Sequence, residues 1–293
     1  MSAQPAPTTA PDPAQGLATP GQGMAHDAVL AAEALSLGFD GRTVVHGVDL
    51  AFERGTVTTV IGPNGCGKST LLRGLGRLLR PTAGRVMLDG GDLASVPPRA
   101  VARRMSILPQ TPQAPAGLTV GELVARGRHP RQRWYEQFSR GDGAAVADAL
   151  AATDIAELAA VPLEDLSGGQ RQRAWISMTL AQETELVLLD EPTTYLDLAH
   201  QVEVLELVQR LNRDLGRTVI MVLHDISLAA RYSDRIVAMR DGRIVASGTP
   251  AEVITPKLLW EVFGLKAEVI TEPTEGRPHV VPIGGCRVVR AVT

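Results

Sequence analysis

The residues from Gly62 to Ser69 have the types and spacing needed to hold a phosphate group. Glycines in the stretch GPNGCGKST let backbone N–H groups approach an anion where side chains would block the way. Lys68 is expected to reach the β- and γ-phosphates of a nucleotide, and the Ser69 hydroxyl to bind Mg²⁺. The pattern predicts nucleotide binding. By itself it leaves open a kinase, a switch GTPase, a repair ATPase and a transport motor.

Two acidic residues end a predicted buried strand in ELVLLDEP. The carboxyl end of a parallel strand beside the phosphate-loop strand is where Mg²⁺ would lie, so Asp190 is expected at the metal. Glu191 is expected to orient and deprotonate an attacking water. A strand followed by an ordinary acidic turn is the alternative, and the phosphate loop upstream favours the catalytic interpretation.

A second anion site is predicted at the start of LSGGQRQRAWISMTLA, residues 166–181. Ser167 is a plausible helix N-cap, and Gly168 and Gly169 expose backbone donors at the helix terminus. A glycine-containing loop before an ordinary amphipathic helix is the alternative. A phosphate loop and a separate anion site on the same chain are explained if two chains hold one ligand between them.

The ordered motifs GPNGCGKST, LSGGQ and LLDEP closely resemble the ATP-binding-cassette (ABC) ATPases, over roughly residues 28–264. In that family two cassettes pack head to tail, and each ATP lies between one chain's phosphate loop and the other chain's LSGGQ signature. The resemblance implies ATP hydrolysis with Mg²⁺. It further implies that Gln110 senses Mg²⁺ and the attacking water and that His224 contacts the γ-phosphate as a switch. Leu196 and Asp197 match the loop that crosses the dimer interface.

The resemblance also supplies a full set of expected site residues. Catalysis is expected from Glu191, His224, Gln110 and Lys68, and Mg²⁺ binding from Ser69, Gln110 and Asp190. Nucleotide contacts are expected from Phe39, Gly62, Pro63, Asn64, Gly65, Cys66, Gly67, Lys68, Ser69, Thr70, Ser167, Gly168, Gly169, Gln170 and Asp197.

Three further residues in that set have competing interpretations. Taken singly, His224 would more often be a structural histidine at a strand end, and the motifs around it favour the switch role. Phe39 stands where the family usually places a tyrosine that stacks on adenine, and it keeps an aromatic face without the hydroxyl. A core-facing residue at a strand end is the alternative. Cys66, inside the phosphate loop, is either a redox-sensitive thiol or a small residue filling a tolerant position, and the burial habits of free cysteine favour the second.

The elements that must position these motifs follow from hydrophobic patterning. Strands are predicted at AVLAAEALSLGF, RTVVHGVDLAFERG, TVTTVIG, GRVMLDG, SILPQ, ELVLLDEP and RTVIMVLHD, and the last two have the continuous apolar character of strands buried on both faces. DRIVAMRDGRIVASG predicts a hairpin that turns at Asp241-Gly242. Helical patterns occupy KSTLLRGLGRLL, LAHQVEVLELVQRLNRDLG and ISLAARYS.

The expected fold is α/β: an ABC-type nucleotide-binding domain in which a P-loop core sheet is joined by an antiparallel β subdomain and an inserted helical subdomain at about residues 111–180. This domain is expected to span residues 28–264. A disordered tail is expected at 1–27 and a β-rich appendage at 265–293.

Composition narrows the partners. The formal net charge of −3 over 293 residues argues against a general nucleic-acid surface. With no run of 18 apolar residues, no transmembrane helix is expected. Residues 1–27 contain no Lys or Arg and no apolar core, unlike a secretory signal. A cytoplasmic protein that touches membranes only through partners is therefore expected.

The stretch ARGRHPRQRWYEQFSRGD, residues 125–142, concentrates arginine with Trp134, Tyr135 and Phe138 in an aromatic-poor chain. Such composition is typical of a protein–protein hot spot, or the aromatics form a small core within the helical insertion. With EPTTYLDLAHQ, it resembles importer cassettes for iron chelates, especially ferric siderophores.

This second resemblance implies a motor that drives uptake through a separate integral-membrane permease fed by a substrate-binding protein. It also implies a peripheral position at the cytoplasmic face of the cell (inner) membrane. The permease contact is expected near Arg128, Trp134 and Tyr135. Haem and cobalamin importers are the nearest competitors. A soluble cassette ATPase acting on nucleic acid or ribosomes is the alternative of another class, but such proteins usually carry two cassettes or a long coiled-coil insertion, and the sequence has neither pattern.

Overall fold

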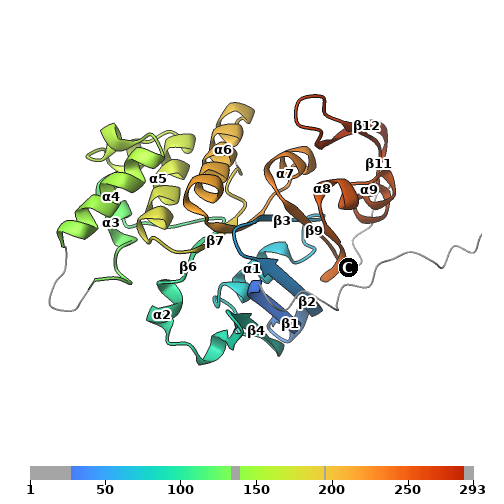
Figure 1. The fold of residues 1–293 in the computed structure, drawn as a ribbon, viewed down its shortest axis with the longest axis horizontal. Coiled ribbons are helices and arrows are strands. Elements are labelled where there is room, and N and C mark those ends of the chain that lie inside the picture. Colours follow the sequence, from blue (N-terminus) through green and yellow to red (C-terminus); the bar gives the residue numbers. More distant parts are fainter. Residues whose placement is uncertain (1–27, 133–138, 195, 287–293) are drawn as a thin grey trace, which may run out of the picture.

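The computed structural model describes residues 28–132, 139–194 and 196–286 (Figure 1). Its centre is a six-stranded sheet in the order β10-β9-β3-β8-β7-β6. The strands are β3 (Val57–Ile61), β6 (Met105–Leu108), β7 (Leu186–Asp190), β8 (Thr218–Val222), β9 (Arg235–Arg240) and β10 (Arg243–Gly248). All neighbours pair in parallel except β9 and β10. Every residue of β3, β7 and β8 is buried, as their apolar and β-branched sequences predict.

A second, antiparallel sheet has the order β2-β1-β4-β5. Its strands are β1 (Ala28–Phe39), β2 (Arg42–Glu53), β4 (Ala83–Leu88) and β5 (Gly91–Asp92). One apolar core fills the space between this sheet, the central sheet and helix α1 (Lys68–Leu75). A Cβ on Gly74 would lie 2.3 Å from Leu37 Cδ1, so glycine lets α1 pack closely on β1.

The opposite face of the central sheet is covered by α6 (Leu198–Leu215) and α7 (Ile226–Tyr232), which share a second core with β3, β7 and β8 (Figure 1). This core continues into a helical region at one end of the molecule. The region contains α3 (Val120–Arg126), α4 (Arg140–Ala152) and α5 (Gly168–Ala181), with short 3₁₀ turns at Ala156–Leu158 and Leu163–Asp165.

The other end of the molecule carries a hairpin of β11 (Leu265–Thr271) and β12 (Pro278–Cys286) (Figure 1). The hairpin is attached to α7, because Val280 N donates to Ser227 Oγ at 3.2 Å and Arg277 Nη1 donates to Ser233 O at 3.0 Å. Two short helices precede it, α8 (Pro250–Val253) and α9 (Pro256–Phe263).

The predicted turn between β9 and β10 shows how local chemistry positions the sheet. Asp241 and Gly242 have φ values of 48° and 73°, the left-handed pair that a two-residue hairpin turn requires. Gly242 O accepts a hydrogen bond from His46 N at 2.9 Å, and a Cβ on Gly242 would lie 2.0 Å from Val44 O. The turn therefore fastens the central sheet to β2.

The predicted fold class is confirmed: a P-loop core sheet, an antiparallel sheet and a helical insertion are all present. Sequence patterning did not predict β5, α2 (Pro98–Ala102), α8 or α9, and the first three are too short for a periodic signal. The tail predicted at 1–27 lies outside the described residues. Within the described ranges, no helix combines the length and apolar character needed to cross a bilayer.

Candidate active site

The phosphate loop connects β3 to α1 and is shaped by glycines. Gly67 is the N-cap of α1 with φ 102°, a conformation that side-chain-bearing residues rarely adopt. A Cβ on Gly62 would lie 2.3 Å from Met239 O, so this position too accepts only glycine. Lys68 is 5 % exposed, and its Nζ donates to Gly62 O at 2.9 Å and to Pro63 O at 3.1 Å. The buried Lys68 ammonium group therefore lies within the loop that is expected to receive the phosphates.

Cys66 is part of the loop's packing. Its side chain is buried in the core that joins the two sheets, and its carbonyl accepts Gly242 N at 3.0 Å. Burial raises the pKa of the Cys66 thiol, although Lys68 acts in the opposite direction. A buried thiol with a raised pKa has little reactive thiolate, which favours the packing interpretation over the redox-sensitive one.

Ser69 and Asp190 bring two oxygen ligands together from different elements. The Ser69 hydroxyl donates to Asp190 Oδ1 at 2.8 Å. Asp190 is 2 % exposed at the carboxyl end of β7, and burial raises the pKa of its carboxyl group. A hydroxyl and a buried carboxylate that forms no ion pair with the described residues are hard oxygen donors of the kind Mg²⁺ prefers. Across the described residues no group of three or more His, Cys, Asp or Glu side chains suits a metal, and Mg²⁺ at a nucleotide needs only one or two carboxylates besides the phosphates.

Glu191 is contacted by His224 and Gln110 from distant parts of the chain and by Thr194 three residues away. Its Oε1 lies 2.7 Å from His224 Nε2, and its Oε2 accepts Gln110 Nε2 at 2.5 Å. Gln110 follows β6 and His224 follows β8, and these strands flank β7 on its two sides. The predicted catalytic residues Glu191, Gln110 and His224 are therefore brought together by the strand order.

The backbone at Glu191 is unusual. Its φ of 53° lies in the left-handed region, where a non-glycine residue is strained, and such strain is concentrated at functional sites. Sequence patterning did not predict the contact with Thr194, whose Oγ1 donates to Glu191 Oε2 at 3.1 Å. Thr194 N also donates to Glu191 O at 3.2 Å, so the three-residue spacing in EPTT was the signal that could have revealed the contact.

The signature residues start α5 in the predicted way. Ser167 is the N-cap: its Oγ accepts Gln170 N at 3.3 Å, and Gln170 Oε1 accepts Ser167 N at 3.0 Å. Gln170 is thereby committed to the cap rather than facing outward. The amides of Gly168 and Gly169 belong to the first turn, whose N–H groups have no partner inside the helix. This helix end is suited to an anion.

Asp197 and Phe39 are both exposed. Asp197 has a side chain that is 67 % exposed, and it caps α6 by accepting His200 N at 3.0 Å. Hydrogen bonds from the His200 backbone and ring lower the pKa of Asp197. Phe39, at the end of β1, is 43 % exposed. The core-facing alternative for Phe39 is therefore wrong, and its ring is open for stacking.

Arg128, near which the permease contact is predicted, points into the chain rather than out to its surface. Its side chain is 7 % exposed and donates to Asp142 Oδ1 at 2.8 Å, Ala181 O at 2.6 Å and Glu183 Oε2 at 2.6 Å. It therefore joins the start of α4 to the end of α5, where a cation also complements the helix dipole. Trp134, Tyr135 and Phe138 lie outside the described residues.

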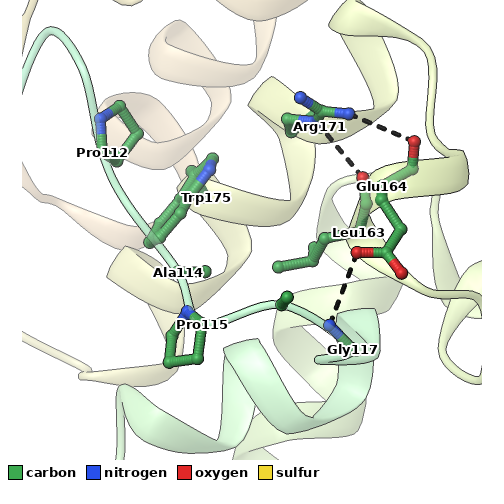
Figure 2. A pocket seen from close by; sticks show the side chains of 9 residues that line it. Pro112, Ala114, Pro115, Gly117, Leu163, Glu164, Arg171 and Trp175 are labelled. Atoms are coloured by element: carbon green, nitrogen blue, oxygen red, sulfur yellow. Dashed lines mark hydrogen bonds between the residues drawn. The ribbon is translucent and has the colours of Figure 1, made fainter.

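A pocket of about 300 Å³ lies between residues 112–117 and α5 (Figure 2). Trp175 lines it, and Arg171 donates from α5 to Leu163 O at 3.2 Å and Glu164 O at 3.4 Å. Glu164 in turn accepts Gly117 N at 3.4 Å. Figure 2 shows these contacts fastening the segment after Gln110 to the base of the signature helix.

A phosphate loop, a buried carboxylate beside it, a carboxylate held by glutamine and histidine, and a separate helix-end anion site together define an ATP-hydrolysing cassette. Residues 45–194 match the ABC transporter family, and the chain belongs to that family as an ATPase subunit.

The chain is 49 % identical to the "Probable siderophore transport system ATP-binding protein YusV" of Bacillus subtilis (strain 168) over 89 % of this chain and 94 % of that protein. Among solved structures, an inward-facing ABC transporter of the metal-chelate type aligns with a TM-score of 0.76 at 26 % identity, covering 88 % of this chain and 98 % of that chain. A dimeric bacterial ABC transporter cassette aligns with a TM-score of 0.68 at 26 % identity, covering 75 % of this chain and 98 % of that one.

Proposed function

We propose that this chain is the ATP-hydrolysing subunit of an importer that takes up an iron chelate, a ferric siderophore, through a separate membrane permease. The observation that carries the proposal is the 49 % identity to YusV over nearly the whole of both chains, in a protein whose name specifies siderophore transport. The likeness to a transporter of the metal-chelate type supports the same class of cargo. The subunit is placed at the cytoplasmic face of the cell membrane by its permease, which receives the chelate from a substrate-binding protein.

In the proposed reaction Glu191 is the general base. Its carboxylate removes a proton from the water that attacks the γ-phosphate, while His224 and Gln110 hold it and the water in line. Lys68 leaves the carbonyls of Gly62 and Pro63 to neutralise the β- and γ-phosphates. Ser69, Asp190 and Gln110 are the residues that would hold Mg²⁺, which supplies positive charge to the phosphate oxygens.

The site is completed by a second copy of the chain. Ser167, Gly168 and the first-turn amides of α5 present an anion site that lies apart from the phosphate loop of the same chain. Two copies packed head to tail would bring each signature to the other copy's nucleotide, and a solved relative is a dimeric cassette. Phe39 stacks on the adenine in this arrangement.

We propose that the permease docks near the predicted aromatic stretch, with Trp134 and Tyr135 as contacts. Arg128 precedes this stretch in the chain and is held inside by Asp142 and Glu183. The pocket beside Trp175 is lined by residues that follow Gln110 in the chain. A partner bound in this pocket would therefore shift Gln110 and with it the hydrogen bond from Gln110 to Glu191.

The cargo is tested by growth of a deletion strain on single iron sources. A plasmid with the wild-type gene is expected to restore growth on one ferric siderophore, and the same plasmid with Glu191→Gln is expected to fail. Haem and cobalamin are supplied in parallel arms. Restoration of haem or cobalamin use, without any siderophore, would replace the proposed cargo while leaving the ATPase assignment intact.

A further inference from the structure

The two glycines of the signature have different surroundings. A Cβ added to Gly168 would meet no atom within 4 Å, and Gly168 is exposed. A Cβ added to Gly169 would lie 2.8 Å from Cδ2 and 3.2 Å from Cγ of His200. The imidazole ring of His200 therefore occupies the space above Gly169, and only glycine allows this approach.

His200 is itself held by the residue that begins its helix. Its Nδ1 lies 2.6 Å from Asp197 Oδ1, and the same oxygen accepts the His200 backbone amide at 3.0 Å. Gln201 Nε2 donates to Leu196 O at 2.8 Å, so the start of α6 also holds the preceding residue of this loop. The Nδ1 atom of the His200 ring therefore contacts Asp197, and the Cδ2 atom of the same ring packs on Gly169 of α5.

We propose that His200 is a positioning residue that joins the loop at Leu196 and Asp197 to the signature, so that Asp197 and the first-turn amides of α5 meet the second cassette as one rigid unit. The inference rests on the proposed two-chain site. Without the ring, the start of α5 and the loop lose their direct contact and are coupled through the apolar core that α5 and α6 share further along. Docking must then remove the resulting extra freedom, which weakens ATP-driven association of the two chains.

Other contacts between α5 and α6 do not replace this one. Arg173 pairs with Glu203 one turn further along both helices, but the Glu203 side chain is 46 % exposed. Exposed ion pairs stabilise little, because water screens them and two long side chains must be ordered. Close to the starts of α5 and α6, where the anion site lies, the His200 ring packs directly on Gly169.

The steric part of the inference is tested by thermal unfolding of the nucleotide-free chain. Gly169→Ala is expected to lower the melting temperature because its methyl group collides with His200. Adding His200→Ala removes the obstacle and is expected to recover most of that loss. Gly168→Ala is the matched control and is expected to unfold like the wild type. A double variant that melts no higher than Gly169→Ala would overturn the contact.

The functional part uses full chains that also carry Glu191→Gln, so that ATP is bound but not consumed. His200→Ala is expected to weaken MgATP-dependent dimerisation in sedimentation experiments about fivefold or more, the range of ordinary coupling between sites. The affinity of the separate chain for MgATP is expected to stay unchanged. His200→Asn, whose side-chain amide can still donate to Asp197, is expected to recover part of the dimerisation.

Wild-type dimerisation by His200→Ala, or an Asn variant no better than Ala, would overturn the positioning role. If Glu191→Gln alone forms no ATP-dependent dimer, the proposed two-chain site is wrong instead. The unfolding experiment would then still decide whether His200 dictates glycine at position 169.

Discussion

The phosphate-loop half and the signature half of this chain are built in different ways. Lys68, Asp190 and Glu191 are 5 %, 2 % and 8 % exposed, and each already has hydrogen-bond partners within the chain. Ser167 and Gly168 are exposed, and so is the Asp197 side chain. The first half lies between two cores at the end of a parallel sheet, whereas the second is the open end of a helix.

This difference indicates which contacts hold each half of the chain in its conformation. Two-sided burial of β3 and β7 holds the catalytic groups with the precision of a packed interior. The signature depends on a capping box and on His200, and Arg128 joins the far end of the same helix to α4. Damage to the first half should therefore abolish chemistry, and damage to the second should loosen assembly.

The largest expected effect comes from Glu191→Gln. Removing a general base lowers turnover by about 10²–10⁴-fold, while ATP affinity is expected to persist because the phosphate loop is unchanged. Phosphate release and nucleotide binding are measured on the same preparation. Glu185→Gln, at a 68 % exposed side chain, is the control and is expected to turn over normally. Near-normal turnover in Glu191→Gln would remove the catalytic role from the buried half.

Arg128→Ala tests the support of the signature half. Removing one partner of a buried ion pair leaves Asp142 without its cation, and losses of about 3–5 kcal/mol in the free energy of unfolding are typical. The measurement is denaturant unfolding, with the exposed Arg126→Ala as control. ATP binding by the folded fraction is expected to survive. Equal stabilities for the two variants would contradict the internal role of Arg128.

Asp190→Asn separates stability from function in the phosphate-loop half. Burial raises the pKa of Asp190, so this group favours folding below its unfolded pKa and loses that advantage as the pH rises through the raised value. At neutral pH the substitution is therefore expected to stabilise the nucleotide-free chain by about 1 kcal/mol, while Ser69 keeps an acceptor. Differential scanning calorimetry with and without MgATP is the measurement. A nucleotide-free variant less stable than the wild type would contradict the destabilising burial of the Asp190 charge. A variant that MgATP still stabilises as much as the wild type would count against the metal assignment.

The smallest effect concerns Cys66. Burial and a raised pKa predict that a thiol reagent labels it slowly in the folded chain and quickly after unfolding. The rate is measured in a Cys286→Ser background, which leaves one thiol. Bound ATP is expected to slow labelling further. Fast labelling of the folded chain at neutral pH would restore the redox-sensitive interpretation.

Much of the architecture was predictable because it is encoded locally. The apolar runs of β3, β7 and β8 demanded burial on both faces, and Asp241-Gly242 specified a turn with two positive φ values. The Ser167 cap with Gln170 three residues later marked the start of α5. The four-residue helix α8 escaped because one turn shows no period, whereas α9 was missed although Leu258, Leu259 and Val262 have helical spacing.

By itself the sequence determined the family, most of the elements and the groups predicted to surround the nucleotide, because periodicity, turn chemistry and motif spacing are properties of neighbouring residues. Only the tertiary structure decided which groups meet. Gln110 and His224 reach Glu191 because β6 and β8 flank β7, and Arg128 turns inward because α4 and α5 close over it. His200 reaches Gly169 because two helix starts converge. Such contacts depend on strand order and helix packing, which no single segment encodes.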